Sequence, residues 1–92
     1  MDPDRVRVRA LVSGRVQGVW FRQSTADAVA GTGVAGWVRN LDDGRVEAVF
    51  EGPPGAVSRA VDYVSHGPQL AQVEDVESLR EEPAGLQGFS VR

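Results

Sequence analysis

Residues 5–29 read RVRVRALVSGRVQGVWFRQSTADAV, and the spacing of the apolar residues changes once along this stretch. Before Gly14, apolar residues alternate with arginines, which predicts a half-buried strand over residues 5–13. From Phe21 onward the spacing is that of one helix face, which comprises Phe21, Thr25, Ala28 and Val29. The two periods predict a strand, a glycine-containing loop and a helix, in that order.

Four further strands and a second helix are predicted in the rest of the chain, with glycine-containing turns between them. The strands are expected at residues 34–40, 45–51, 71–79 and 88–92. The helix carries an apolar stripe of Val57, Ala60, Val61 and Val64. The stretch LDDG (41–44) predicts a hairpin between two of the strands. A slip of the apolar phase between Val73 and Val76 predicts a bulge or a bend.

This order, βαββαβ with one more strand, predicts an α/β (α+β) sandwich of the ferredoxin-like type in a single domain over residues 1–92. We expect an antiparallel sheet of strand order 4-1-3-2, two helices on one face and a short extra C-terminal strand. The other face is expected to carry outward-pointing charges at Arg5, Arg7, Arg9, Glu47 and Glu51. Cross-strand ion pairs are the favoured interpretation of these charges, ahead of ligand binding.

The composition is ordinary for a soluble protein and mildly acidic. The 92 residues are 41% hydrophobic and carry a net charge of −3, which argues against a general nucleic-acid binder. Because the chain has no cysteine, disulfides, thiolate metal sites and a cysteine nucleophile are excluded. No apolar run is long enough to span a membrane, and the N-terminus lacks the apolar centre of a signal peptide. We therefore expect a cytoplasmic protein with no membrane or nucleic-acid partner.

Two stretches match known motifs only in part. GTGVAG (31–36) has the glycine pattern of a dinucleotide site, but it follows a predicted helix and opens a strand, the reverse of what that site needs. Counted from Gly14, a P-loop requires glycine and lysine where the chain has Val19 and Trp20. The one histidine, His66, lies at a helix end, where contact with the last carbonyls is favoured over catalysis. No metal-ligand spacing is found.

The loop from Gly14 to Phe21 is the remaining candidate site. Its two glycines allow main-chain N–H groups to converge on an anion, and the following helix adds free N–H groups and the positive end of its dipole. Arg22 in the first helical turn is unfavourable to that dipole, but its planar guanidinium matches two oxygens of a phosphate. From these residues alone, a phosphate site and an ordinary loop with an incidental surface arginine are equally supported.

Asn40 ends the second predicted strand, which runs parallel to the first. The C-terminal ends of both strands therefore lie at one end of the sheet, and Asn40 is expected beside the glycine loop. A carboxamide can accept a hydrogen bond from water and donate one to an oxygen, so it can orient a nucleophile without becoming charged. The first position of the NLDDG turn is an equally common use of asparagine.

Several motifs, in the same order and spacing, make the chain resemble the acylphosphatase family over nearly its whole length. They are GRVQGVWFR, GVAGWVRN, GRVEAVFEG, HGP and a final GFSVR. The resemblance implies the ferredoxin-like fold. It also implies hydrolysis of the carboxyl–phosphate bond of small acyl phosphates to a carboxylate and inorganic phosphate, with no metal or organic cofactor.

The resemblance further implies roles for individual residues. Arg22 matches the family's phosphate-binding arginine, and Asn40 its water-orienting asparagine. The main chain of the loop matches the phosphate cradle, at Gly14, Arg15, Val16, Gln17, Gly18, Val19 and Trp20. No strong general base is visible, which suggests that a phosphate oxygen of the substrate takes the proton of the attacking water.

We expect a monomer whose partners are its acyl phosphate substrate and its product, inorganic phosphate. The alternative function is that of a catalytically idle regulatory domain, which binds a phosphorylated metabolite in the same cradle. An RNA-recognition module shares the βαββαβ order but needs exposed aromatic residues on its central strands. The third predicted strand, GRVEAVFEG, has one aromatic residue and it is predicted to point inward.

Overall fold

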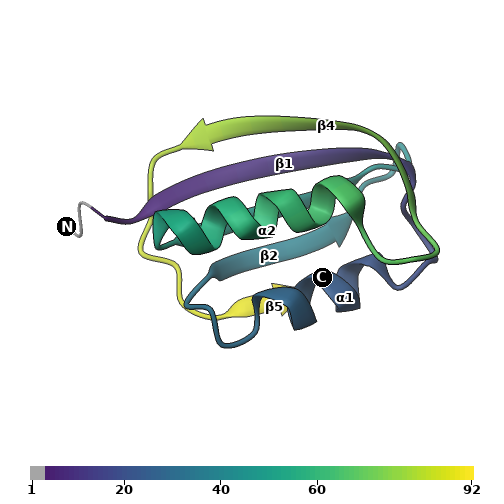
Figure 1. The fold of residues 1–92 in the computed structure, drawn as a ribbon. Coiled ribbons are helices and arrows are strands. Elements are labelled where there is room, and N and C mark those ends of the chain that lie inside the picture. The colour runs from purple at the N-terminus through teal and green to yellow at the C-terminus, as the bar shows by residue number, and fades with distance from the viewer. Residues whose placement is uncertain (1–3) are drawn as a thin grey trace.

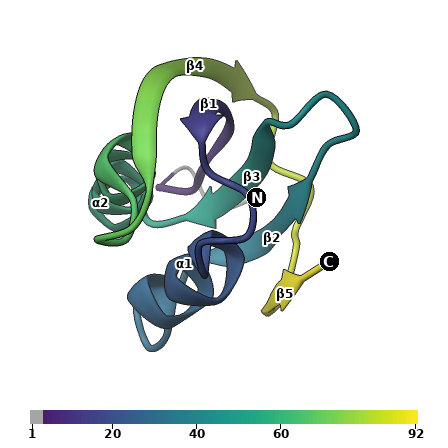
Figure 2. The ribbon, with the colours of Figure 1, turned by 90° about the vertical axis from the view of Figure 1, so that its right-hand side faces the viewer.

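A computed structural model describes residues 4–92 as two layers, a five-stranded sheet with two helices packed on one of its faces (Figures 1 and 2). The elements in chain order are β1 (Val6–Arg15), α1 (Phe21–Val29), β2 (Ala35–Asn40), β3 (Val46–Gly52), α2 (Pro54–His66), β4 (Gln72–Glu81) and β5 (Phe89–Val91). Every predicted strand and helix is confirmed, and β1 extends past its predicted end at Ser13. Within the described residues, neither helix has the length and apolarity needed to cross a membrane.

The strand order of the sheet is β4-β1-β3-β2-β5, which confirms the predicted 4-1-3-2 order and adds β5 at one edge. β1 pairs antiparallel with both β3 and β4, and β2 pairs antiparallel with β3. β5 instead pairs parallel with β2, so the complete sheet is mixed rather than antiparallel. The cause is the path of residues 82–88, which cross the end of the sheet and enter β5 at the end where β2 begins (Figure 1).

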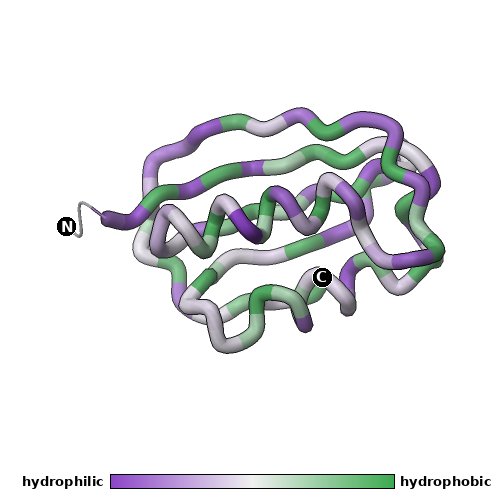
Figure 3. The backbone as a smooth tube through the Cα atoms, viewed as in Figure 1, coloured by the Kyte–Doolittle hydropathy of each residue, from purple (hydrophilic) through white to green (hydrophobic). Residues whose placement is uncertain are grey.

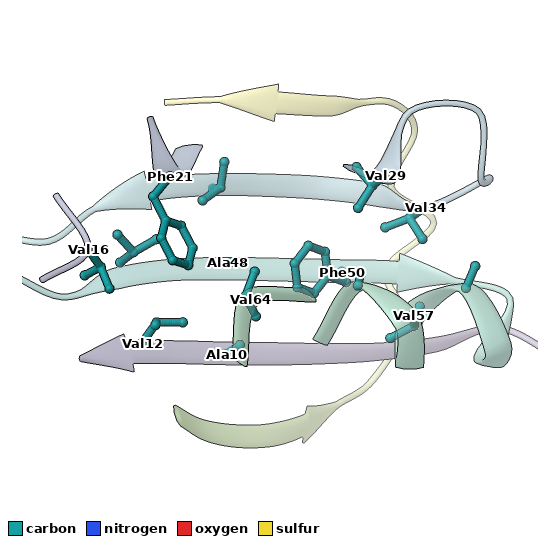
Figure 4. Close-up of a cluster of buried hydrophobic side chains, with 14 of the residues drawn as sticks. Ala10, Val12, Val16, Phe21, Val29, Val34, Ala48, Phe50, Val57 and Val64 are labelled. Atoms are coloured by element: carbon teal, nitrogen blue, oxygen red, sulfur yellow. The ribbon is translucent and has the colours of Figure 1, made fainter. Parts of the chain in front are cut away.

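The core lies between the helices and the sheet, and its residues follow the two predicted periods. Alternating apolar and polar residues are visible along β1 in Figure 3, and its apolar face packs under α2. Figure 4 shows side chains from β1, from the loop that follows it, from β3 and from both helices meeting in one cluster. Its largest buried members include Val12, Val16, Phe21, Val38, Val46, Phe50, Val57 and Val64. Ala28 was predicted in this core but is exposed, because the buried positions of α1 are Phe21, Thr25 and Val29, four residues apart.

A bulge in β4 sets the direction in which β1 leaves the sheet. Ser13 pairs with Asp75 whereas Gly14 pairs with Val73, so Glu74 is an extra residue on β4. This confirms the bulge predicted between Val73 and Val76. A Cβ atom at position 14 would lie 2.2 Å from the carbonyl oxygen of Gln72, and φ there is +121°, so only glycine fits. The end of β1 therefore has a fixed course into the loop that follows.

The face of the sheet opposite the helices carries the predicted ion pairs. Arg7 Nε and Arg9 Nε each lie 2.8 Å from an oxygen of Glu81, and Arg39 Nε lies 2.7 Å from Glu47 Oε1. Arg9 also pairs with Glu47. Cross-strand pairing on this face is thereby confirmed.

The expectation that Glu47 and Glu51 point into solvent is wrong, because their side chains are buried. Glu51 is 0% exposed, and it accepts hydrogen bonds at 2.8 Å from the N–H groups of Ala84 and Leu86 and at 3.2 Å from Arg5 Nη2. Burial alone raises the pKa of this carboxyl, but these donors together lower the pKa from 4.5 to about 2. The segment between β4 and β5 thus covers part of a face that was expected to be open.

Candidate active site

The candidate loop begins where β1 ends and runs to the start of α1. Gly14 and Arg15 still belong to β1, where they pair with Val73 and Gln72 of β4. Residues 16–20 form the loop itself, and α1 begins at Phe21. Of the seven predicted cradle residues, the structure therefore places two in the strand and five in the loop.

The loop is anchored by its own side chains. Val16 and Val19 are 1% and 6% exposed and belong to the core. Between them, Gln17 Nε2 donates to the carbonyl oxygens of Leu41 at 2.8 Å and Arg45 at 3.0 Å, in the β2–β3 turn. Gly18 adopts the left-handed conformation, with φ +72°, and no atom lies within 4 Å of where its Cβ would be. Core packing and the Gln17 hydrogen bonds thus hold the loop in place, while its surface at Gly18 stays accessible.

Main-chain N–H groups of the loop and the first helical turn have no acceptor in the part of the chain that the structure describes. The first helical hydrogen bond runs from Ser24 N to Trp20 O, at 2.9 Å, and α1 has no side-chain cap and no acidic residue in its first turn. Within residues 4–92, no carbonyl or side chain accepts a hydrogen bond from the N–H groups of residues 17–23. These donors and the positive end of the helix dipole make the region attractive to an anion.

Arg22 projects from the first turn of α1 and is half-buried. Its Nη1 donates a hydrogen bond to the main-chain oxygen of Arg92, at 2.6 Å, and no Asp or Glu side chain among residues 4–92 pairs with it. Arg92 is itself held by a hydrogen bond from its N–H to Val38 O, at 2.9 Å, and by its guanidinium, 4.3 Å from the centre of the Trp37 ring. One donor of Arg22 is therefore engaged, and the guanidinium is oriented from the C-terminal segment.

Asn40 lies at the end of β2, where its main chain pairs with Val46 of β3. Its side chain is exposed and has no hydrogen-bond partner among residues 4–92. The predicted proximity to the loop is confirmed, since Asn40 and Arg22 line the same cavity of about 470 Å³. The cavity is lined by Val16, Gly18, Trp20, Phe21, Arg22, Gln23, Asn40 and Val91.

Some of the predicted site residues do not line this cavity, and some of its lining was not predicted. Gly14, Arg15, Gln17 and Val19 are absent from the lining, although Gln17 and Val19 anchor the loop. Val91 of β5 lines the cavity, and Arg92 accepts a hydrogen bond from Arg22. Neither contact was predicted from the sequence. No local sequence signal indicates these contacts, because they depend on which edge of the sheet β5 joins.

A second, larger cavity of about 540 Å³ lies elsewhere in the structure, over α2, β1 and β4. Its apolar floor includes Val8, Val57 and Val61, and none of the predicted site residues lines it. The smaller cavity differs in combining a guanidinium, a carboxamide and N–H groups that have no acceptor among residues 4–92. Among residues 4–92, no group of three or more histidine, aspartate and glutamate side chains is placed to hold a metal ion.

The matching family model is acylphosphatase, and acylphosphatases occur among both the curated relatives and the similar solved structures. The family model for acylphosphatase matches residues 8–91. An acylphosphatase of Rubrobacter xylanophilus is 60% identical, over 94% of this chain and 79% of its own length. An acylphosphatase of Gloeobacter violaceus is 56% identical, over 94% of this chain and 92% of its own length. The crystal structure of acylphosphatase from Bacillus subtilis has a TM-score of 0.89 at 38% identity and covers 95% of this chain and 98% of that one.

Proposed function

Because the chain belongs to the acylphosphatase family and is an acylphosphatase, we propose that the cavity shared by Arg22 and Asn40 is its active site. The substrate is an acyl phosphate, and inorganic phosphate is a product. One observation carries the proposal. An arginine from α1 and an asparagine from β2 line one cavity, beside a run of N–H groups for which residues 4–92 provide no acceptor.

In this proposal the loop and Arg22 bind the phosphate group of the substrate. The free N–H groups of residues 17–23 and the unengaged donors of the Arg22 guanidinium face a dianionic group with three terminal oxygens. Gly14 and Arg15 contribute by fixing the start of the loop, and residues 16–20 supply its main chain. Preorganised donors stabilise the charge on these oxygens in the transition state, which is the main demand of phosphoryl transfer.

Asn40 is proposed to orient the attacking water. The water oxygen forms a bond to phosphorus while the bond from phosphorus to the acyl oxygen breaks, and the carboxylate leaves with the electron pair of that bond. One proton of the water moves to a phosphate oxygen and the other stays on the attacking oxygen, so the products are a carboxylate and dihydrogen phosphate. A carboxylate is a good leaving group and needs no general acid, which fits a site whose polar side chains are Arg22, Gln23 and Asn40.

We propose that a single domain and a single chain suffice for this reaction, without a metal or an organic cofactor. Support comes from the lining of the cavity, since Arg22, Asn40 and the loop all belong to one chain, and from the positive charge that Arg22 and the N–H groups supply themselves. Cytoplasmic location and the absence of nucleic-acid and membrane partners stay predictions of the sequence.

The decisive experiment is phosphate release from acetyl phosphate in the presence of EDTA, by the wild-type protein and by Arg22→Ala. We expect release by the wild type and its loss in the variant. Wild-type protein that binds inorganic phosphate but releases none from the substrate would instead indicate the idle regulatory domain. A pH–rate profile that requires an enzyme group with its own pKa would exclude proton transfer to the substrate.

A further inference from the structure

Trp20 is the large apolar residue of the loop that does not pack into the protein. Its side chain is 75% exposed, whereas its neighbours Val19 and Phe21 are 6% and 2% exposed. An exposed indole forgoes the burial that stabilises an aromatic side chain in a core. Packing within the chain therefore does not explain tryptophan at this position.

The backbone of Trp20 is also unfavourable for a bulky residue. With φ 64° and ψ 17°, it is the one non-glycine residue with positive φ in the described part of the chain. Glycine and asparagine adopt this left-handed conformation readily, whereas a large side chain is strained in it. Exposure and backbone conformation thus both disfavour tryptophan on grounds of stability, and strain of this kind often marks a functional position.

The cavity that Trp20 lines has a polar part and an apolar part. Arg22, Asn40 and the N–H groups form the polar part. Trp20 and Val91, which is 42% exposed, contribute apolar surface to the same lining. An acyl phosphate is divided in the same way, because a charged phosphate is joined through one oxygen to an acyl group. At about 470 Å³, the cavity has room beyond what a phosphate group fills.

We propose that Trp20, together with Val91, binds the acyl group of the substrate, and that the enzyme selects acyl phosphates with an aromatic or extended apolar acyl group. This inference rests on the proposed function, since it requires the phosphate group to be held by Arg22 and the loop. The flat face of an indole can cover an aromatic ring or an alkyl chain, whereas the methyl group of acetyl phosphate buries little surface against it. Trp20 is then the specificity-determining residue of the site.

The test compares kcat/KM for benzoyl phosphate with kcat/KM for acetyl phosphate. Asparagine accepts the left-handed conformation, so Trp20→Asn removes the ring while retaining the turn, and Trp20→Phe retains an aromatic ring. We expect wild type to prefer benzoyl phosphate, and Trp20→Asn to lower the benzoyl-to-acetyl ratio about 10-fold. Trp20→Phe should keep most of the preference. Leu70→Ala, which removes another exposed apolar side chain (68% exposed) outside the cavity, is the matched control and should leave the ratio unchanged.

Inhibition by inorganic phosphate separates this inference from damage to the cradle. A distorted cradle weakens phosphate inhibition and slows both substrates by the same factor, so the ratio stays constant. A constant ratio in Trp20→Asn, or a wild type without preference for benzoyl phosphate, would overturn the role of Trp20 even if Arg22→Ala abolishes both activities. Failure of the proposed function has a different signature, namely turnover of both substrates that survives in Arg22→Ala.

Discussion

Arginines occur both in the β1–α1 region and on the outer face of the sheet, and their surroundings differ sharply. Arg7 and Arg9 each lie 2.8 Å from an oxygen of Glu81. Glu51 accepts hydrogen bonds from Arg5 and from two main-chain N–H groups. Among residues 4–92, Arg22 donates a hydrogen bond to the main-chain oxygen of Arg92, and no Asp or Glu side chain pairs with it. The outer-face arginines compensate buried carboxylates of the protein, whereas in the proposed function Arg22 keeps donors for the phosphate group of the substrate.

If the proposed function holds, the partner of an arginine, more than its place at the sheet, separates structural from functional roles. A carboxylate that is buried beside a guanidinium must stay paired, because an unpaired buried charge strongly destabilises the fold. A guanidinium beside free N–H groups creates local positive charge that only a bound anion offsets. Substitution of Arg22 should therefore lower activity with little change in stability, whereas substitution of a buried carboxylate on the outer face should lower stability with little change in activity.

The largest effect on activity is expected at Arg22. Arg22→Ala should lower kcat/KM by on the order of 10³-fold or more, because it removes charge stabilisation in the transition state. Arg22→Lys should also be poor, since an ammonium group cannot replace a planar fork. Steady-state kinetics and phosphate inhibition measure both. Urea denaturation should show a change in unfolding free energy below about 1 kcal/mol, as for other surface substitutions. Wild-type activity in either variant would contradict the role of Arg22.

The largest effect on stability is expected at Glu51. Glu51→Gln should lower the free energy of unfolding by about 3 kcal/mol at neutral pH, since Arg5 and Arg7 lose their buried partner. Activity of the folded variant should stay within about twofold of wild type, because Glu51 lies at the opposite end of β3 from Asn40. Urea denaturation and kinetics test both expectations. A large loss of kcat in the folded variant would contradict the inference that the outer face contributes to stability and not to activity.

The same carboxylate predicts a pH dependence of stability. Its pKa is about 2 in the folded protein and 4.5 ordinarily, so the folded state favours the ionised form. The resulting stabilisation, about 3 kcal/mol, is present above pH 4.5 and is lost as the pH falls toward 2. Denaturation curves measured between these limits should therefore converge for wild type and Glu51→Gln. Curves that stay equally far apart as the pH falls would contradict the assignment to Glu51.

A smaller effect on activity is expected at Asn40. Asn40→Ala should lower kcat by on the order of 10²-fold, because the attacking water loses its orientation. Inhibition by inorganic phosphate should be nearly unchanged, since the proposed phosphate ligands are the loop and Arg22. This separation of kcat from phosphate binding distinguishes Asn40 from Arg22 within one cavity. Unchanged turnover would show that Asn40 has only a structural role, as the first residue of the turn between β2 and β3.

The smallest effect is expected at Gln17, whose side chain joins the loop to the β2–β3 turn. Gln17→Ala should lower kcat by about 10-fold, because the loop and Asn40 are no longer held in register. Gln17→Glu is a useful companion, since a carboxylate cannot donate to the carbonyls of Leu41 and Arg45. Kinetics of both variants that match wild type would show that Val16 and Val19 alone fix the loop.

Much of the fold could be predicted because local patterns and tertiary packing agree. The period of two in residues 5–13 and the four-residue spacing from Phe21 correspond to β1 and α1, and the phase slip between Val73 and Val76 corresponds to the bulge at Glu74. The predictions that were wrong concern contacts between residues far apart in the sequence. Burial of Glu51 depends on Ala84 and Leu86, more than thirty residues away, and β5 is parallel because residues 82–88 cross the sheet end.

The sequence by itself determined the element order, the glycine loop, Arg22 in the first turn of α1 and Asn40 at the end of β2. These features depend on local periodicity, on glycine conformation and on motifs of adjacent residues. Only the tertiary structure decided that Arg22 and Asn40 share a cavity, that Val91 and Trp20 give it an apolar side, and that Arg92 orients Arg22. These contacts join segments far apart in the chain, and their geometry follows from strand order and packing.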